Sequence, residues 1–135
     1  MTTIEKFEDL EIWKKSRILS SKIYPLTFKE PIASDYRIKD QLRESVGSIM
    51  DNITEGFDRS SKPEFINSLS IAKGESGELK SQLYRCLGNN YISQKLFDEL
   101  YNLADELTKM ITSFIIYLNK TSIKGQKFKN RTGNA

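Results

Sequence analysis

Pairs of carboxylates are the residues in this sequence with the most potential for chemistry. Glu8 and Glu11 are three positions apart, and so are Glu75 and Glu78, so each pair would lie on one face of a helix. Helix-borne glutamates can hold two metal ions inside a helical bundle, but that arrangement also needs a histidine three residues after a glutamate on two of the helices. The sequence contains no histidine. We therefore interpret both pairs as surface charge and predict no metal and no other cofactor.

Other catalytic arrangements are also missing from the sequence. Without histidine, the commonest general base is absent, and the single cysteine, Cys86, can form neither a Cys–His nucleophile nor a zinc site of the usual type. Gly74-Glu75-Ser76-Gly77 lies inside a heptad pattern rather than after a strand, so it does not predict a phosphate-binding loop. The sequence therefore predicts a protein that is not an enzyme.

A polar stripe follows an apolar seam between residues 35 and 59. Its members are spaced by three or four residues: Gln41, Ser45, Ser48, Asn52, Glu55 and Arg59. Polar groups beside a seam must be hydrogen-bonded if they become buried. We favour a buried network that fixes the register of helices or subunits over a surface for a ligand or RNA. Gly56, Gly74 and Gly77 lower helix stability, so we interpret them as places where two backbones approach closely.

Basic residues form a second candidate surface. They alternate with Glu11, Asp40 and Glu44, so a solvated face of mixed charge is one interpretation. The other is a face that contacts phosphates and is repeated in each subunit of an oligomer. The candidates for nucleic-acid contact are Lys14, Lys15, Arg37, Lys39 and Arg43. We assign the only tryptophan, Trp13, to the core or to an interface rather than to base stacking.

Four helices must position these residues. Apolar residues recur at intervals of three and four, and no strand-like alternation persists. The pattern predicts helices over about 9–28, 35–59, 62–88 and 93–119. Candidate N-caps are Asp9, Ser34, Ser61 (with Glu64 in a capping box) and Ser93. Pro25 should kink or end the first helix, because it has no N–H to donate.

The fourth helix carries the clearest seam. Its predicted core positions are Leu96, Leu100, Leu103, Leu107, Met110 (with Ile111), Phe114 and Leu118. A strict seven-residue apolar repeat implies left-handed packing, and short connections make neighbouring helices antiparallel. The sequence therefore predicts an all-α, up-and-down antiparallel four-helix bundle with left-handed packing. Further apolar residues around the same helix, among them Phe97, Ile116 and Tyr117, favour self-association.

Composition predicts where the protein works and where its folded part ends. The net charge is +3 over 135 residues, but residues 120–135 hold five basic residues and no acid. Residues 1–119 then carry 16 basic and 18 acidic groups, so we expect a nearly neutral bundle and a basic, disordered tail. The tail either contacts nucleic acid or only aids solubility. No apolar run is long enough for a membrane helix, and one cysteine suits a reducing compartment, so we expect a cytoplasmic protein.

Three segments resemble one known family. Residues 7–16 (FEDLEIWKKS) resemble its opening pattern F-x-D-L-x-x-W-x-x-S/A. Residues 41–59 (QLRESVGSIMDNITEGFDR) resemble its central pattern Q-x-R-R-A-x-x-S-I-x-x-N-I-A-E-G-x-x-R, and residues 65–79 resemble its third helix. This is the bacterial four-helix bundle family often called S23 ribosomal proteins. Its members are encoded within intervening sequences of 23S rRNA genes, and relatives are accessory proteins of diversity-generating retroelements.

The resemblance implies a non-enzymatic ring, typically a homopentamer, with a basic outer surface suited to RNA or DNA. It also implies a possible protein partner such as a reverse transcriptase. The residues carried over by position, chiefly for assembly, are Arg43, Asn52, Glu55, Gly56 and Arg59. Departures from the family pattern are Glu44, where a second arginine is usual, and Asp51 and Asp58 at small positions. These acids lower the local positive charge, so the alternative is a protein-binding scaffold without a nucleic-acid role.

Overall fold

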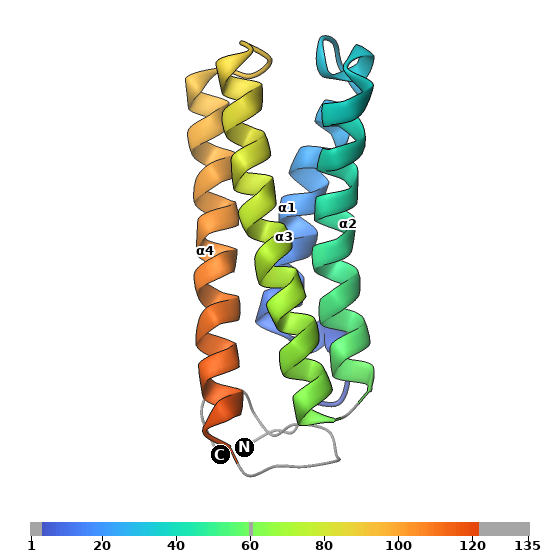
Figure 1. The fold of residues 1–135 in the computed structure, drawn as a ribbon, viewed down its shortest axis with the longest axis vertical. Helices are drawn as coiled ribbons and strands as arrows, with labels where there is room; N and C mark the ends of the chain where they lie inside the picture. Colours follow the sequence, from blue (N-terminus) through green and yellow to red (C-terminus); the bar gives the residue numbers. More distant parts are fainter. Residues whose placement is uncertain (1–3, 60, 122–135) are drawn as a thin grey trace.

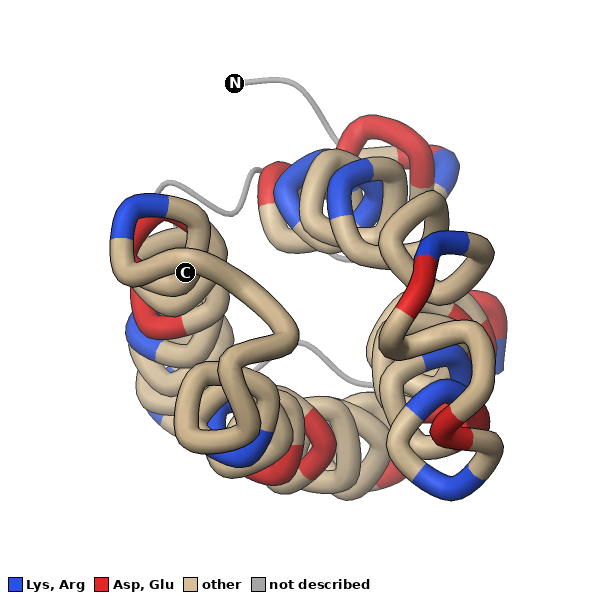
Figure 2. The backbone as a smooth tube through the Cα atoms, turned by 90° about the horizontal axis from the view of Figure 1, so that it is seen from above, with Lys and Arg blue, Asp and Glu red and all other residues tan. Residues whose placement is uncertain are grey.

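The computed structural model of the chain describes residues 4–59 and 61–121, and within them every regular element is a helix. The long helices are α1 (Glu11–Ile23), α2 (Tyr36–Asp58), α3 (Lys62–Gly88) and α4 (Gln94–Asn119). Consecutive helices run in opposite directions (Figure 1). Contacts join α1 to α2, α2 to α3, α3 to α4, and α4 back to α1, so the helices surround one axis, with charges of both signs around the outside (Figure 2). The predicted all-α four-helix bundle is confirmed, and the handedness of its packing stays a prediction.

The first helix begins and ends differently from the prediction. Phe7–Asp9 form a 3-10 turn, η1, and α1 starts after Leu10 with no side-chain cap, so the expected N-cap at Asp9 is wrong. At the other end α1 stops at Ile23, and a 3-10 turn, η2, covers Tyr24–Phe28. The expected effect of Pro25 is therefore confirmed, since proline cannot donate the next helical hydrogen bond.

The expected caps of the next two helices need correction. Asp35, not Ser34, caps α2, because its carboxylate accepts a hydrogen bond from the Ile38 N–H at 3.3 Å. Ser34 instead lies in a 3-10 turn, η3 (Ile32–Ser34), and its hydroxyl donates to Glu30. Ser61 is the residue before α3, but its side chain makes no capping bond, so the capping box does not form.

The cap of α4 follows the sequence prediction. Ser93 precedes the helix, and its hydroxyl oxygen accepts a hydrogen bond from the Leu96 N–H at 3.1 Å. A serine in extended conformation directly before an apolar repeat is a strong start signal. The start of α4 is thus fixed by local sequence, unlike the starts of α1 and α3.

One core receives apolar side chains from all four helices. In α4 the buried residues are Phe97, Leu100, Ala104, Leu107, Ile111, Phe114 and Leu118. Leu96, Leu103 and Met110 are only half-buried, so the predicted seam is wrong at these three positions. An apolar residue directly follows each of them, and α4 is turned so that these next residues, Phe97, Ala104 and Ile111, face the core instead.

The lone thiol lies in this core. Cys86 is 1% exposed, and burial raises the pKa of its thiol to about 11. Among the residues that the structure describes, no helix is long and apolar enough to cross a membrane, and no three of their Cys, Asp or Glu side chains are placed to hold a metal ion. Of the predicted basic tail, only Lys120 and Thr121 are described; the rest lies outside the described residues.

Candidate nucleic-acid interface

The connection from α1 to α2 lies at one end of the bundle (Figure 1). Exposed aromatic rings lie on this connection and on the first residue of α2. Tyr24 is 42% exposed, Phe28 66% and Tyr36 70%. The 3-10 geometry of η2 turns Thr27 inward, where it is 1% exposed, and leaves the two rings of this turn outside. We call the surface formed with two basic residues of α2 the aromatic–cation patch: Tyr24, Phe28, Tyr36, Lys39 and Arg43.

Arg43 is the centre of this patch. The carbon of its guanidinium group lies 4.8 Å from the ring centre of Tyr24 and 4.5 Å from that of Phe28, within the range of cation–π attraction. Its Nε donates a hydrogen bond to Thr27 Oγ1 at 2.8 Å, and the Thr27 hydroxyl donates to the Tyr24 carbonyl at 2.7 Å. The guanidinium is therefore held in place through Nε, and its Nη groups have no hydrogen-bond partner among the described residues.

Lys39 repeats this arrangement one turn earlier. Its Nζ lies 4.7 Å from the ring centre of Tyr36. Tyr36, Lys39 and Arg43 are spaced by three and four residues, so they share one flank of α2. Within residues 4–59 and 61–121, neither Lys39 nor Arg43 forms an ion pair with a carboxylate. Both cations are thus oriented by aromatic rings but not neutralised.

The basic residues of α1 are in a different state. Lys14 pairs with Glu11 at 3.3 Å, and Lys15 pairs with Glu106 of α4. A third cation, Lys22, pairs with Glu99 of α4 at 3.1 Å. Each of these lysines has a carboxylate beside it, so less of its charge is available to a phosphate.

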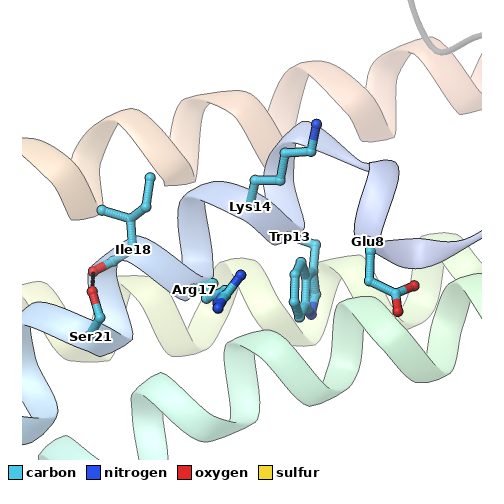
Figure 3. A pocket seen from close by; sticks show the side chains of 6 residues that line it. All are labelled: Glu8, Trp13, Lys14, Arg17, Ile18 and Ser21. Atoms are coloured by element: carbon cyan, nitrogen blue, oxygen red, sulfur yellow. Dashed lines mark hydrogen bonds between the residues drawn. The ribbon is translucent and has the colours of Figure 1, made fainter.

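A shallow depression of about 600 Å³ lies on the outside of α1. Its lining residues are Glu8, Trp13, Lys14, Arg17, Ile18 and Ser21 (Figure 3). Trp13 and Arg17 lie next to each other, whereas Lys14 points away from them (Figure 3). The indole is half-buried, packs against the core, and meets the Phe7 ring edge-on at 5.2 Å between centres. Trp13 thus packs at the edge of the core, in agreement with its assignment from the sequence.

Arg37 is separated from the other basic residues of α2. It follows Tyr36 directly, so it projects about 100° away around the helix, and it is exposed. The five predicted contact residues therefore do not form one surface. Lys39 and Arg43 lie together in the patch. Lys14 and Lys15 lie on α1, and each forms an ion pair with a glutamate. Arg37 lies on the side of α2 that carries the polar stripe.

The polar stripe of α2 faces α3 and is largely paired within the chain. Gln41 accepts a hydrogen bond from Arg85 at 2.9 Å, and Ser45 accepts one from Gln82 at 3.0 Å. Asn52 donates back to the Ser48 carbonyl at 2.9 Å and to its hydroxyl at 3.0 Å. Arg59 lies 3.6 Å from Glu55 and 3.9 Å from Glu64 of α3. These contacts support the structural interpretation of the stripe.

Gly56, next to Glu55 of the stripe, shows how closely α2 and α3 approach each other. A Cβ atom added at Gly56 would lie 2.6 Å from Ser68 Cβ, so the predicted close approach of backbones is confirmed there. At Gly74 and Gly77 nothing lies within 4 Å of an added Cβ atom, so the same prediction is wrong for both positions within the chain.

Glu75 of α3 is half-buried beside the polar stripe of α2. Burial first, and then the charge of Glu78, raise the pKa of the Glu75 carboxyl above its usual range.

The rings of the patch were not selected by the sequence analysis. Tyr24 and Phe28 lie in the connection between α1 and α2, around Pro25 and Pro31, and Tyr36 is the first residue of α2. Several aromatic residues in a short connection, where side chains are usually small and polar, were the available signal. No local pattern in the sequence, however, indicated that Arg43, several helical turns later, would lie on two of these rings.

The chain is similar to proteins of one family. Residues 8–113 match the family described as "23S rRNA-intervening sequence protein". A crystal structure of a protein with unknown function from the S23 ribosomal protein family of Bacteroides thetaiotaomicron superposes with a TM-score of 0.72 at 26% sequence identity. The match covers 78% of this chain and 95% of that one. No curated protein matches the sequence.

Proposed function

We propose, because the chain belongs to the 23S rRNA-intervening sequence protein family, that it is a non-enzymatic, oligomeric protein that associates with RNA in the cytoplasm. The observation that carries the proposal is the pair of cations in the aromatic–cation patch. Lys39 and Arg43 have rings beneath them and no carboxylate partner among the described residues. Positive charge that is held in position but not neutralised is what a phosphate backbone binds.

Oligomerisation supports this function because one patch supplies little charge. A ring of identical subunits repeats the patch, and linked weak sites add up to a usable affinity. Exposed apolar side chains away from the patch, such as Ile71 (46% exposed) and Ile116 (50% exposed), favour contact between copies. The family resemblance makes a pentamer the expected assembly.

A protein-binding scaffold is the second candidate, favoured by a row of acids. Asp40, Glu44, Asp51 and Asp58 are all exposed on the outer side of α2, at spacings that keep them on one face. Such a row repels phosphates and attracts a basic partner surface. If this candidate is correct, tagged protein treated with nuclease should still retain its partners; partners that are lost with the nucleic acid argue against it.

Binding of labelled nucleic acid tests the proposed function. Protein freed of nucleic acid is titrated against a structured RNA and a duplex DNA, with fluorescence anisotropy read at two salt concentrations. Light scattering on the same sample gives the mass. We expect an oligomer whose RNA affinity falls steeply with salt, because counterions are released when phosphates are bound. An equally well-formed oligomer that binds neither nucleic acid at low salt would exclude the proposal.

A further inference from the structure

We propose that the aromatic–cation patch binds unpaired nucleotides of single-stranded RNA, with bases stacked on Phe28 and Tyr36 and phosphates held by Arg43 and Lys39. This inference rests on the proposed function and deepens it, because it names the form of RNA that is recognised.

The exposed rings are the first argument. Phe28 is 66% exposed and Tyr36 70% exposed, so most of each ring stays in water in the isolated chain. Rings of this kind are the platforms on which proteins stack unpaired bases, and stacking tolerates any base because every base has a π face. The two rings belong to different elements, one at the end of η2 and the other at the first position of α2.

The cations are the second argument, because each one lies on a ring. Nζ of Lys39 is 4.7 Å from the centre of Tyr36, and the guanidinium carbon of Arg43 is 4.5 Å from the centre of Phe28. A nucleotide presents a flat base and a phosphate a few ångströms apart, so a ring with a neighbouring cation matches both parts of it. Arginine suits this role because its planar group stacks on rings and still donates hydrogen bonds to phosphate oxygens.

Preorganisation is the third argument. The Thr27 hydroxyl accepts the Arg43 Nε–H at 2.8 Å, and Thr27 itself is 1% exposed. The arginine is therefore held by a buried partner before any ligand arrives, which lowers the entropy lost on binding. The hydrogen bond uses the inner nitrogen and leaves the Nη groups for a ligand.

Charge on the rest of α2 argues against duplex RNA as the preferred ligand. A double helix hides its base faces and offers mainly phosphates, so it gains nothing from the exposed rings. It also brings a second charged strand towards the outer side of α2, where Asp40 and Glu44 are exposed. Two cations beside two acids bind a duplex weakly, whereas a single strand adds stacking energy to the same cations.

A variant of the patch tests the inference. An unstructured RNA of about 12 nucleotides, within the range of single-strand sites, is compared with an RNA duplex of equal length in anisotropy titrations at low salt. The wild-type protein should prefer the single strand. The double variant Phe28→Ala/Tyr36→Ala should bind the single strand at least about tenfold more weakly, the loss typical of one or two stacked bases, with its duplex affinity unchanged. Phe28→Trp/Tyr36→Trp should keep the single-strand affinity.

Tyr84→Ala is the matched control. Tyr84 is also an exposed aromatic residue, at 56%, but the nearby Lys80 is paired with Asp105 at 2.8 Å. Its removal should change single-strand affinity less than about twofold, the usual effect of a surface position outside a binding site. Circular dichroism and light scattering on every variant check folding and mass.

The outcomes separate the inference from the proposed function. A wild-type protein that binds the duplex as well as the single strand, or a double variant that binds like the wild type, overturns the inference and leaves RNA association standing. A double variant that loses mass and keeps its single-strand affinity per subunit shows that a second copy of the chain covers the rings, which also overturns it. A wild-type protein that binds neither RNA overturns both.

Discussion

The two flanks of α2 carry similar polar and basic side chains but differ in what meets them. On the flank towards η2, Lys39 and Arg43 meet aromatic rings and one hydroxyl, so their charges stay available. On the flank towards α3, Ser45 and Arg59 meet Gln82 and Glu64. One helix can therefore serve binding on one side and packing on the other, and the neighbouring segment decides which.

The largest expected effect is a loss of stability on the packed flank. Gly56→Ala places a Cβ atom 2.6 Å from Ser68 Cβ, so the helices must shift, and overpacking of this kind costs about 1–3 kcal/mol. In Gly47→Ala, also in α2, the added Cβ atom meets nothing within 4 Å. This variant should have a free energy of unfolding higher by roughly 0.5–1 kcal/mol, because alanine has the greater helix propensity. Denaturant unfolding measures both; equal effects would show that α2 and α3 do not meet closely at Gly56.

The next effect is a loss of binding on the open flank. Arg43→Met keeps the length of the side chain but removes the charge, so RNA affinity should fall about tenfold, or roughly 1.4 kcal/mol. Arg59→Met removes a charge already shared with Glu55 and Glu64 and should alter RNA affinity less than about twofold. Anisotropy titrations compare the two variants. The distinction between the flanks fails if both lose the same affinity.

A smaller effect concerns pH and the packed flank. Glu75 has a carboxyl pKa raised by burial and then by Glu78, so its stabilising contribution is present at low pH and is lost as pH rises through the raised pKa. Glu75→Gln should therefore be more stable than the wild type at pH 7 by about 0.3 kcal/mol, the size of a like-charge helix pair. The gain should shrink towards pH 4. A gain that is the same at both pH values would place its origin elsewhere.

The last prediction concerns α1, where RNA affinity should change little. Lys14 and Lys15 each have a carboxylate partner, so Lys14→Gln/Lys15→Gln should reduce RNA affinity less than about threefold and change stability by under about 1 kcal/mol. The same titrations and unfolding curves measure both quantities. A loss as large as that of Arg43→Met would move the RNA contact from the α1–α2 end to the outside of α1.

The sequence predicted the elements better than it predicted the site. Apolar repeats, Pro25 and Ser93 are local signals, so the bundle, the early end of α1 and the cap of α4 followed from them. The cap at Ser34 was misplaced because two capping residues, Ser34 and Asp35, stand next to each other, and local sequence alone does not choose between them. The cap at Asp9 was misplaced because Asp9 lies in a 3-10 turn and α1 begins after Leu10, without a side-chain cap.

Partners across the bundle explain most of what was missed. Lys15 and Arg43 are both basic residues on predicted helices, and the sequence gives no reason to separate them. In the structure, Lys15 forms an ion pair with Glu106, whereas the guanidinium group of Arg43 lies over the Phe28 ring. Only the packing of α1 against α4, and of η2 against α2, determines these neighbours. Likewise, Gly56 and Gly74 have the same helix propensity, but another helix packs closely against Gly56 and nothing lies within 4 Å of a Cβ atom added at Gly74.

The burial of Cys86 affects how the protein responds to oxidants. With a pKa of about 11, on the order of one thiol in ten thousand is ionised at pH 7, and the thiolate is the form that attacks peroxides and disulfides. Its exposed fraction of 1% hinders those reagents further. The protein should therefore behave alike under reducing and oxidising conditions, without mixed disulfides or thiol-linked dimers.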